Sequence, residues 1–374
     1  MSVQNMSATT SAAAAVVALS ALLVDSIYLT LIPAHIAMLT VITYWMSQRS
    51  PKALVLFGAL FFASLAYLLI VNLIVPLGDR FFNESIKYII LMLFIISVME
   101  FPKFARSALF YLSLFIPSAL LIYVMFSADS LVYGGRLGVA ISDSDQDAMI
   151  SANTIGFALN ICIITIVCHK NKIFYLFIPA IFYLEFLTFS RGTFLSLSII
   201  ATTYFFKIKK FRYAVFVSLL SLPIFLDFNV EYLNNYLRLD DTTGSGRSII
   251  YEILIERMIA NPVTLIFGHG PGSINFEIYS GKTLISAHSG YFELLYTFGI
   301  IGLFVWIWFF WNALNNLRNL SLDSALYAAL LAAYAISEDL NGSHNLLLIG
   351  LILGVFLNDL KRVHQSRRAS IAGT

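Results

Sequence analysis

The chain has 374 residues, of which 59% are hydrophobic and 12% charged, and its formal net charge is +2. Soluble globular proteins carry about 25% charged residues, so the composition argues against a soluble fold. It predicts an all-α polytopic membrane protein. The two cysteines, Cys162 and Cys168, lie in one apolar stretch rather than in loops, which does not favour a disulfide framework.

Apolar stretches long enough to cross about 30 Å of hydrocarbon follow one another along the chain. They predict a single membrane domain, residues 1–374, with about 12 transmembrane helices. The spans are expected near residues 8–24, 27–46, 53–76, 86–99, 108–126, 149–168, 173–189, 193–206, 213–228, 298–314, 324–336 and 346–359. A long segment, residues 229–287, separates spans 9 and 10 and is expected to be a large helical loop.

Lysine and arginine set the expected orientation. With both termini in the cytoplasm, most of the 23 basic residues fall in short cytoplasmic loops and in the C-terminal tail, as the positive-inside rule requires. The cytoplasmic loops are then interpreted as basic anchors. The segments 127–148 and 229–287 lie outside, and segments of that length usually carry function. We therefore expect the functional site on the outer face.

The first candidate residues of the long loop are Arg247 and Arg257. They lie on the stretch 247–260, whose apolar and charged residues alternate as in a helix lying in the membrane interface, and Asn261-Pro262 is expected to end it. A guanidinium offers a planar fork of donors that fits phosphate oxygens. The alternative is that both arginines pair with anionic headgroups or with nearby acids, namely Glu252 and Glu256.

A glycine-rich turn follows, from Gly268 to Ser273. The backbone N–H groups around Gly268 and Gly270 would face an anion if the turn formed a nest. Glycine and proline clusters are more commonly simple turns, and that alternative stays open.

His288 is a candidate general base. It precedes an apolar helix expected to begin near Ser289, with Ser286 as N-cap, and the helix dipole disfavours the imidazolium form. A neutral imidazole can accept a proton from an attacking hydroxyl; the alternative is a histidine that bonds the backbone. Gly299 is expected to let a neighbouring helix approach closely.

Two further candidates precede the loop. Arg191 lies in the turn Ser190-Arg191-Gly192 and either reaches the outer site or anchors the turn at the membrane surface. Glu185 is a carboxylate within a span, where a pairing or functional role is expected, and Arg191 is its expected partner. The acidic stretch 143–147 lacks the glycine and glutamate of a calcium loop, so no metal site is predicted.

These motifs resemble the bacterial O-antigen ligase/polymerase superfamily of inner-membrane glycosyltransferases. The resemblance covers the layout of about a dozen spans with one large late periplasmic loop, and it is most specific from residue 189 onward. It rests on the Ser190-Arg191-Gly192 turn, Gly246-Arg247, the arginine-x10-glycine spacing from Arg257 to Gly268, and the histidine-x10-glycine spacing from His288 to Gly299.

The resemblance implies glycosyl transfer on the periplasmic face, without metal or cofactor. The donor would be a glycan on undecaprenyl pyrophosphate, whose pyrophosphate Arg191, Arg247 and Arg257 would bind. His288 would deprotonate the acceptor hydroxyl, giving inversion. The implied acceptor is another lipid-linked glycan for a polymerase, which the SGR context and the short chain favour, or lipid A–core for a ligase. Membrane lipids and a chain-length regulator would be partners, and nucleic acid would not.

A lipid-linked sugar transporter or flippase is the alternative from another class. It would place charges along a pathway at the bilayer midplane. This chain keeps its spans nearly free of charge and concentrates cations at the outer edge, which favours the enzyme.

Overall fold

A computed structural model describes the helical body of the protein. The residues it describes are 81–126, 152–169, 171–188, 190–210, 247–274, 287–337 and 346–372, with the short pieces 38, 41–42, 66, 137, 139–140, 149–150, 212–213, 215, 276–277 and 283–284. The helices are α4 (Phe81–Glu100), α5 (Pro102–Phe126), α6 (Ala152–Cys168), the 3-10 helix η1 (Lys172–Phe177), α7 (Ile178–Thr188), α8 (Arg191–Lys207), α11 (Arg247–Ile259), α12 (Pro262–Phe267), α13 (Gly290–Asn316), α14 (Leu322–Ser337) and α15 (Leu346–Ala372).

Helices occupy eight of the predicted spans, from the fourth to the eighth and from the tenth to the twelfth. Two of them, α5 and α13, are long and apolar enough to cross a membrane, and α6 and α14 are apolar but shorter. The spans 8–24, 27–46, 53–76 and 213–228 fall outside the described residues apart from isolated positions, so the total of 12 stays a prediction. The described chain departs from a purely helical fold only in two antiparallel pairs of two-residue strands, β1 (Val139–Ala140) with β2 (Met149–Ile150) and β3 (Phe276–Glu277) with β4 (Thr283–Leu284).

Helix α6 forms the centre of the core. Every residue from Ile155 to Ile166 is buried, because α5, α7, α8 and α14 pack around this helix. A helix that is apolar on all sides must be buried on all sides, and α6 meets that condition. Its Thr165 hydroxyl hydrogen-bonds the Tyr327 hydroxyl of α14 at 2.9 Å.

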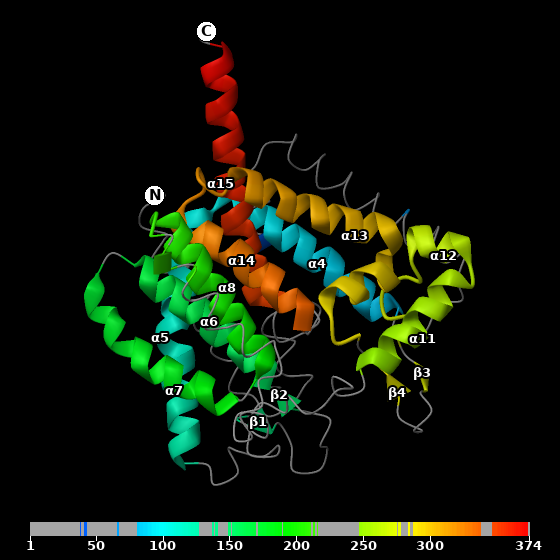
Figure 1. Ribbon diagram of the computed structural model, residues 1–374, viewed down its shortest axis with the longest axis horizontal. Helices are drawn as coiled ribbons and strands as arrows, with labels where there is room; N and C mark the ends of the chain where they lie inside the picture. Colours follow the sequence, from blue (N-terminus) through cyan, green and yellow to red (C-terminus); the bar gives the residue numbers. More distant parts are fainter. Residues whose placement is uncertain are drawn as a thin grey trace.

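Helix α15 packs along α4 through two small residues one turn apart. A Cβ built on Gly350 would come within 2.4 Å of the Phe94 ring, and one on Gly354 within 2.3 Å of a Val98 methyl. Small residues spaced four apart let helix backbones approach closely. The last turns of α15 extend beyond the other helices (Figure 1), and residues 364–370 are exposed.

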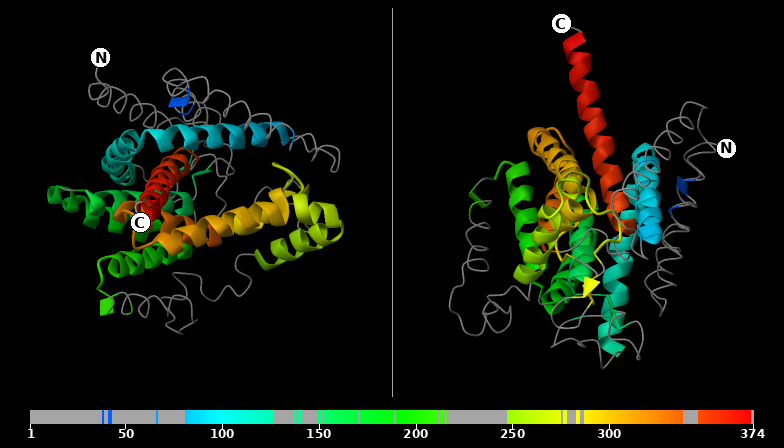
Figure 2. Two further views of the ribbon diagram at one scale, coloured as in Figure 1. Left: turned by 90° about the horizontal axis from the view of Figure 1, so that it is seen from above. Right: turned by 90° about the vertical axis from the view of Figure 1, so that its right-hand side faces the viewer.

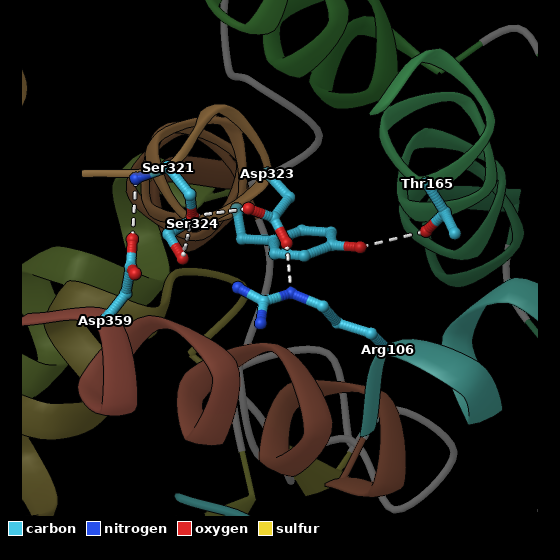
Figure 3. Close-up of polar contacts among 7 residues, drawn as sticks. Arg106, Thr165, Ser321, Asp323, Ser324 and Asp359 are labelled. Carbon is cyan, nitrogen blue, oxygen red and sulfur yellow. Dashed lines mark hydrogen bonds and ion pairs between the residues drawn. The ribbon is translucent and has the colours of Figure 1, made fainter. Parts of the chain in front are cut away.

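The end of the bundle that is expected to face the cytoplasm is held by a polar network (Figure 3). Arg106 of α5 donates to Asp323 of α14 at 2.6 Å, and the Ser321 backbone N–H donates to Asp359 of α15 at 2.6 Å. Nearby, the Lys207 ammonium donates to the backbone carbonyls of residues 317, 318 and 320. Interpreting the basic residues of this end only as membrane anchors was therefore wrong for Arg106, which binds α14, and for Lys207, which binds the turn between α13 and α14.

The long loop contains a helical hairpin. Helix α11 ends at Ile259, close to the expected position, but Asn261 and Pro262 do more than end it. The Asn261 side chain accepts a hydrogen bond from the Val263 N–H at 3.0 Å and caps a second helix, α12, with Pro262 in its first turn. Asparagine at the N-cap and proline at the first helical position are both favourable. The expectation that Asn261-Pro262 only terminates a helix was incomplete for this reason.

Candidate functional site

The α11–α12 hairpin lies against one end of α13 (Figures 1 and 2). A small separate core joins them, made of Ile250, Leu254, Met258, Ile274, Ala287 and Tyr296. Beside it the rings of Tyr251 and Phe292 stack at 4.1 Å, with 6° between their planes. The apolar face of α11 is therefore buried against α13, its opposite face carries the exposed Glu252 and Glu256, and the exposed Arg257 lies at the edge of the buried face.

Gly268 and Gly299, which end the two spacing patterns, are in direct contact. A Cβ built on Gly268 would lie 2.2 Å from the Thr297 carbonyl oxygen, and one on Gly299 would lie 2.1 Å from the Ile266 carbonyl oxygen. Both residues have a positive φ, +81° and +67°, which glycine adopts without strain. The expected close approach at Gly299 is confirmed, and the neighbouring helix is α12.

The backbone is non-helical at Gly299 (φ 67°, ψ −165°), so α13 is broken at this point. In an unbroken helix the carbonyls of Tyr296 and Thr297 would accept hydrogen bonds from residues 300 and 301. Here they accept from the glycine turn instead: His269 N–H donates to Tyr296 O at 2.8 Å, and Gly270 N–H donates to Thr297 O at 2.9 Å.

These hydrogen bonds also show whether the backbone N–H groups at the start of the glycine-rich turn are available to bind an anion. Gly268 N–H donates to Thr264 O at 2.8 Å, so the N–H groups of residues 268, 269 and 270 all bind protein carbonyls. The nest interpretation is therefore wrong for these three groups. The glycines allow close packing of the turn on α13.

Three side chains from three segments come together beside this contact. The His269 ring stacks on the Tyr296 ring at 4.2 Å, with only 4° between the planes. Tyr296 is 2% exposed, and the positive charge of Arg257 acts on the His269 imidazole that covers it. Arg257, on the last turn of α11, is therefore close to this aromatic pair.

His269 stays neutral in this environment. Burial lowers the pKa of its imidazole below the ordinary value; the Tyr296 backbone acts in the opposite direction, and the positive charge of Arg257 adds to the lowering. At neutral pH the site therefore carries one positive charge at this point, that of Arg257.

His288 lies two residues before α13 and is exposed. Its φ is +51°, a conformation that non-glycine residues adopt rarely and mainly where the surroundings enforce it. The helix begins at Gly290 with Ser289 as N-cap, so the expected cap at Ser286 was wrong. The Ser289 hydroxyl makes no capping bond because it donates to the Ala335 carbonyl of α14 at 3.3 Å.

A carboxylate that the sequence interpretation overlooked supports the same segment. Glu293, in the first turn of α13, accepts a hydrogen bond from the Ala287 backbone N–H at 3.4 Å. The residues on both sides of His288 are thus tied to neighbouring elements, which fixes the backbone that presents the imidazole.

The remaining predicted site residues lie on separate elements. Arg191 is the first residue of α8, after Ser190, whose side chain accepts from the Thr193 N–H at 3.2 Å. Arg247 is the first residue of α11, and its side chain lies outside the described residues. Arg257 lies on the last turn of α11, near the contact between Gly268 and Gly299, whereas Arg191 lies at the start of α8.

The pairing expected for Glu185 was wrong. Its carboxylate is 0% exposed, and neither oxygen has a hydrogen-bond partner among the described residues. Glu185 is buried on α7, which packs on α6. Helix α7 ends at Thr188, and Arg191 already belongs to α8. The two residues therefore lie on different helices, although only five residues separate them in the sequence.

Two residues of this site were missed in the sequence, His269 and Tyr296. His269 stands inside the glycine-rich turn and Tyr296 three residues before Gly299, so each lies next to a recognised motif. Their contact joins positions 27 residues apart, and no local pattern predicts a contact at that separation.

The described residues form a helical fold that is consistent with a membrane protein, with a polar helical hairpin packed on the entry of a long apolar helix. Residues 154–307 match the family described as O-antigen ligase, a region that begins in α6 and ends within α13. The match includes Arg191, Arg247, Arg257 and His288. It confirms, over this region, the resemblance to the O-antigen ligase/polymerase superfamily. No curated protein and no solved structure matches the chain.

Proteins of this family are membrane-integral, glycosyltransferase-like enzymes that act on lipid-linked glycans. The match therefore supports a membrane protein with a ligase- or polymerase-type function in lipopolysaccharide or related polysaccharide biosynthesis.

Proposed function

We propose that this protein polymerises glycan repeat units carried on undecaprenyl pyrophosphate, at the periplasmic face of the bacterial inner membrane. The growing glycan is the donor, and a second lipid-linked repeat unit is the acceptor. The observation that carries the proposal is the match over residues 154–307, because that region contains all three candidate arginines and the candidate base.

The chemistry assigned to the arginines is stabilisation of the leaving group. Transfer breaks the bond between the anomeric carbon and the pyrophosphate oxygen, and the pyrophosphate gains negative charge as it leaves. Arg191, Arg247 and Arg257 would bind its oxygens through charge-assisted hydrogen bonds. These cations take the place of a bound metal ion in the proposal. The exposed position of Arg257 at the end of α11 supports this assignment.

His288 is assigned as general base. Its neutral imidazole takes the proton of the acceptor hydroxyl as the oxygen attacks the anomeric carbon from the face opposite the leaving group, so the configuration inverts. Its exposure and the fixed backbone on both sides of it, tied through Glu293 and Ser289, support the role. The conformation at His288 is of the strained kind that clusters at functional sites.

The experiment is to delete the gene and examine the glycan of the cell surface. A single repeat unit on the lipid core is the result expected of a polymerase. Bare core, with long chains accumulating on the undecaprenyl carrier, would identify a ligase that uses lipid A–core as acceptor. An unaltered surface glycan would contradict both functions.

A further inference from the structure

We propose that the short helix α12 enters the membrane beside α13, where its exposed apolar side chains contact lipid acyl chains. We call this surface, formed by Ile259, Val263 and Ile266, the α12 patch. The contact is independent of the transfer chemistry proposed above, because it involves none of the residues assigned to that chemistry.

The α12 patch is exposed although its side chains carry no polar group. Ile259, Val263 and Ile266 are 65%, 40% and 45% exposed. Val263 and Ile266 are three residues apart on α12 and so share a face of that helix, which contains no charged residue. Ile259 is the last residue of α11, directly before the turn into α12. Apolar surface is unfavourable in water, and a contiguous patch of it marks a contact with another apolar surface.

The apolar face of α11 is not available for the same contact. The sequence favoured α11 as a helix that lies in the membrane interface, but Ile250, Leu254 and Met258 of that face belong to the small core against α13. The exposed side of α11 mixes apolar residues with Glu252 and Glu256. The uncharged surface that the hairpin presents outward is therefore that of α12 and of the adjoining end of α11.

The α12 patch adjoins the face of α13 that is expected to meet lipid. Helix α12 packs on α13 at Gly299, where an added Cβ would lie 2.1 Å from the Ile266 carbonyl oxygen, and the two helices lie side by side (Figures 1 and 2). Directly after Gly299, Ile300 and Ile301 are exposed and begin the series of exposed apolar side chains on α13. One apolar surface therefore continues onto α12 from a helix that is long and apolar enough to cross a membrane.

The length of α13 places this contact at the depth of the lipid chains. The exposed apolar side chains of α13 end at Leu314, which the exposed Asn315 follows. A helix needs about 20 residues to cross the hydrocarbon, and about 20 residues counted back from Leu314 reach Leu295. The hydrocarbon is therefore expected to extend past Gly299, the residue that α12 touches.

The composition of the α12 patch favours lipid over a protein partner. Binding energy at protein interfaces is concentrated in Trp, Tyr and Arg side chains, and the three residues of the patch are aliphatic. Lipid chains make non-directional contacts, and amphipathic segments bury their apolar face about 5–10 Å into the boundary between headgroups and chains. An aliphatic surface that continues a spanning helix suits that environment.

The test measures the depth of spin labels on full-length protein in vesicles of phosphatidylethanolamine and phosphatidylglycerol. Val263→Cys and Ile266→Cys are each labelled in a background in which Cys162→Ala and Cys168→Ala remove the native thiols. Oxygen partitions into the lipid chains, whereas a hydrophilic nickel complex stays in water. The ratio of the two collision rates therefore reports whether a label lies in lipid.

Two further positions calibrate the ratio. Glu252→Cys, at an exposed position of α11, is the matched control on the same hairpin. Phe304→Cys, at an exposed position of α13, is the reference for a side chain in lipid. Neither residue belongs to the patch or to the proposed transfer chemistry.

We expect the labels at positions 263 and 266 to collide more often with oxygen than with the nickel complex, as the label at 304 does, and the label at 252 to show the reverse. Labels at 263 and 266 that meet the nickel complex as often as the label at 252 does would show that the patch faces water. Labels that neither reagent reaches would show that protein covers the patch, either another segment or a second copy of the chain. Both results would overturn the proposal.

A second measurement needs no substitution and applies even if a cysteine variant does not fold. The wild-type protein is placed in vesicles that contain a lipid with a photoactivated diazirine on its acyl chain, irradiated and digested with trypsin. Cleavage after Arg257, Lys282 and Arg318 separates residues 258–282 from residues 283–318. We expect label on both peptides and, in the first, between residues 259 and 267. Label on residues 283–318 alone would contradict the proposal.

Discussion

At the scale of single residues, the three candidate arginines differ in their positions on the helices that carry them. Arg257 lies on the last turn of α11, close to the stacked rings of His269 and Tyr296, and Arg191 begins a helix whose N-cap is Ser190. Arg247 begins α11, where the helix dipole favours anions. A helix start with an arginine at its first position is a favourable place for a phosphate, which agrees with the role proposed for Arg191 and Arg247.

Arg247→Lys tests whether the shape of the cation matters. Lysine keeps the positive charge but loses the planar fork, and it binds phosphate as a point charge. We expect glycan transfer to fall about tenfold or more. Arg318→Lys, an exposed position after the far end of α13, is the matched control and should keep full activity. A wild-type rate for Arg247→Lys would show that the arginine is merely structural.

His269 predicts a dependence of stability on pH. Its pKa is lowered in the folded protein, so the unfolded chain takes up the proton at a higher pH than the folded protein does. In the interval between the two pKa values the unfolded state binds more protons, and stability rises with pH there. The stabilisation is complete above about pH 6.5, the ordinary histidine pKa, and is lost as pH falls toward the folded value.

The measurement is the apparent melting temperature of purified protein between pH 5 and pH 8. We expect His269→Phe, which keeps an aromatic ring on Tyr296, to lose part of the decline seen in the wild type at low pH. His364→Phe replaces an exposed histidine of α15 and should leave the decline unchanged. Identical curves for the wild type and His269→Phe would contradict the prediction.

At the scale of elements, the break in α13 is the feature that joins helix and hairpin. Its first part, residues 290–298, supports the hairpin, and its second part carries exposed apolar side chains such as Phe304, Trp308 and Trp311. Those side chains suit a lipid-facing surface. One helix therefore connects the candidate site to the membrane body.

Gly299→Ala should destabilise this junction. The added methyl group would meet the Ile266 carbonyl at 2.1 Å, and the positive φ is strained for alanine. We expect a lower melting temperature and loss of transfer activity. Ile300→Ala, at the neighbouring exposed position, is the control and should have little effect. A fully stable and active Gly299→Ala protein would show that the close contact is dispensable.

The sequence predicted the positions of these elements better than their connections. Hydropathy located eight helices because an apolar stretch of sufficient length is a local property. The hairpin's second helix was missed, since Asn261-Pro262 ends one helix and starts another with the same two residues. The pairing of Glu185 with Arg191 failed because proximity in sequence does not carry across the boundary between α7 and α8.

At the scale of the whole molecule, the described chain divides into a helical body and a polar hairpin. The body is built on the buried helix α6. One end is closed by the bond of Arg106 to Asp323 (Figure 3) and by the bonds of Lys207 to backbone carbonyls. The hairpin packs on the entry of α13 (Figure 1). That division is consistent with a scaffold that holds a site at one face of a membrane.

Motif spacing selected glycines and cations as candidates, and the structure supplies a physical role for the glycines. Gly268 and Gly299, which end the two spacing patterns, touch each other. Spacing could not predict Tyr296 or His269, whose roles depend on a contact between distant segments. The proposed roles of Arg191, Arg247 and His288 rest on the resemblance and on their positions.

The most direct test of the central claim is the transfer reaction itself. Wild-type protein and His288→Ala are purified, supplied with lipid-linked oligosaccharide extracted from a deletion strain, and compared for the formation of longer glycans and release of undecaprenyl pyrophosphate. We expect the wild type to elongate the glycan and the variant to lose the reaction by about 100-fold or more, as removal of a general base does, with an unchanged melting temperature. Elongation by a correctly folded His288→Ala protein at the wild-type rate would contradict the account.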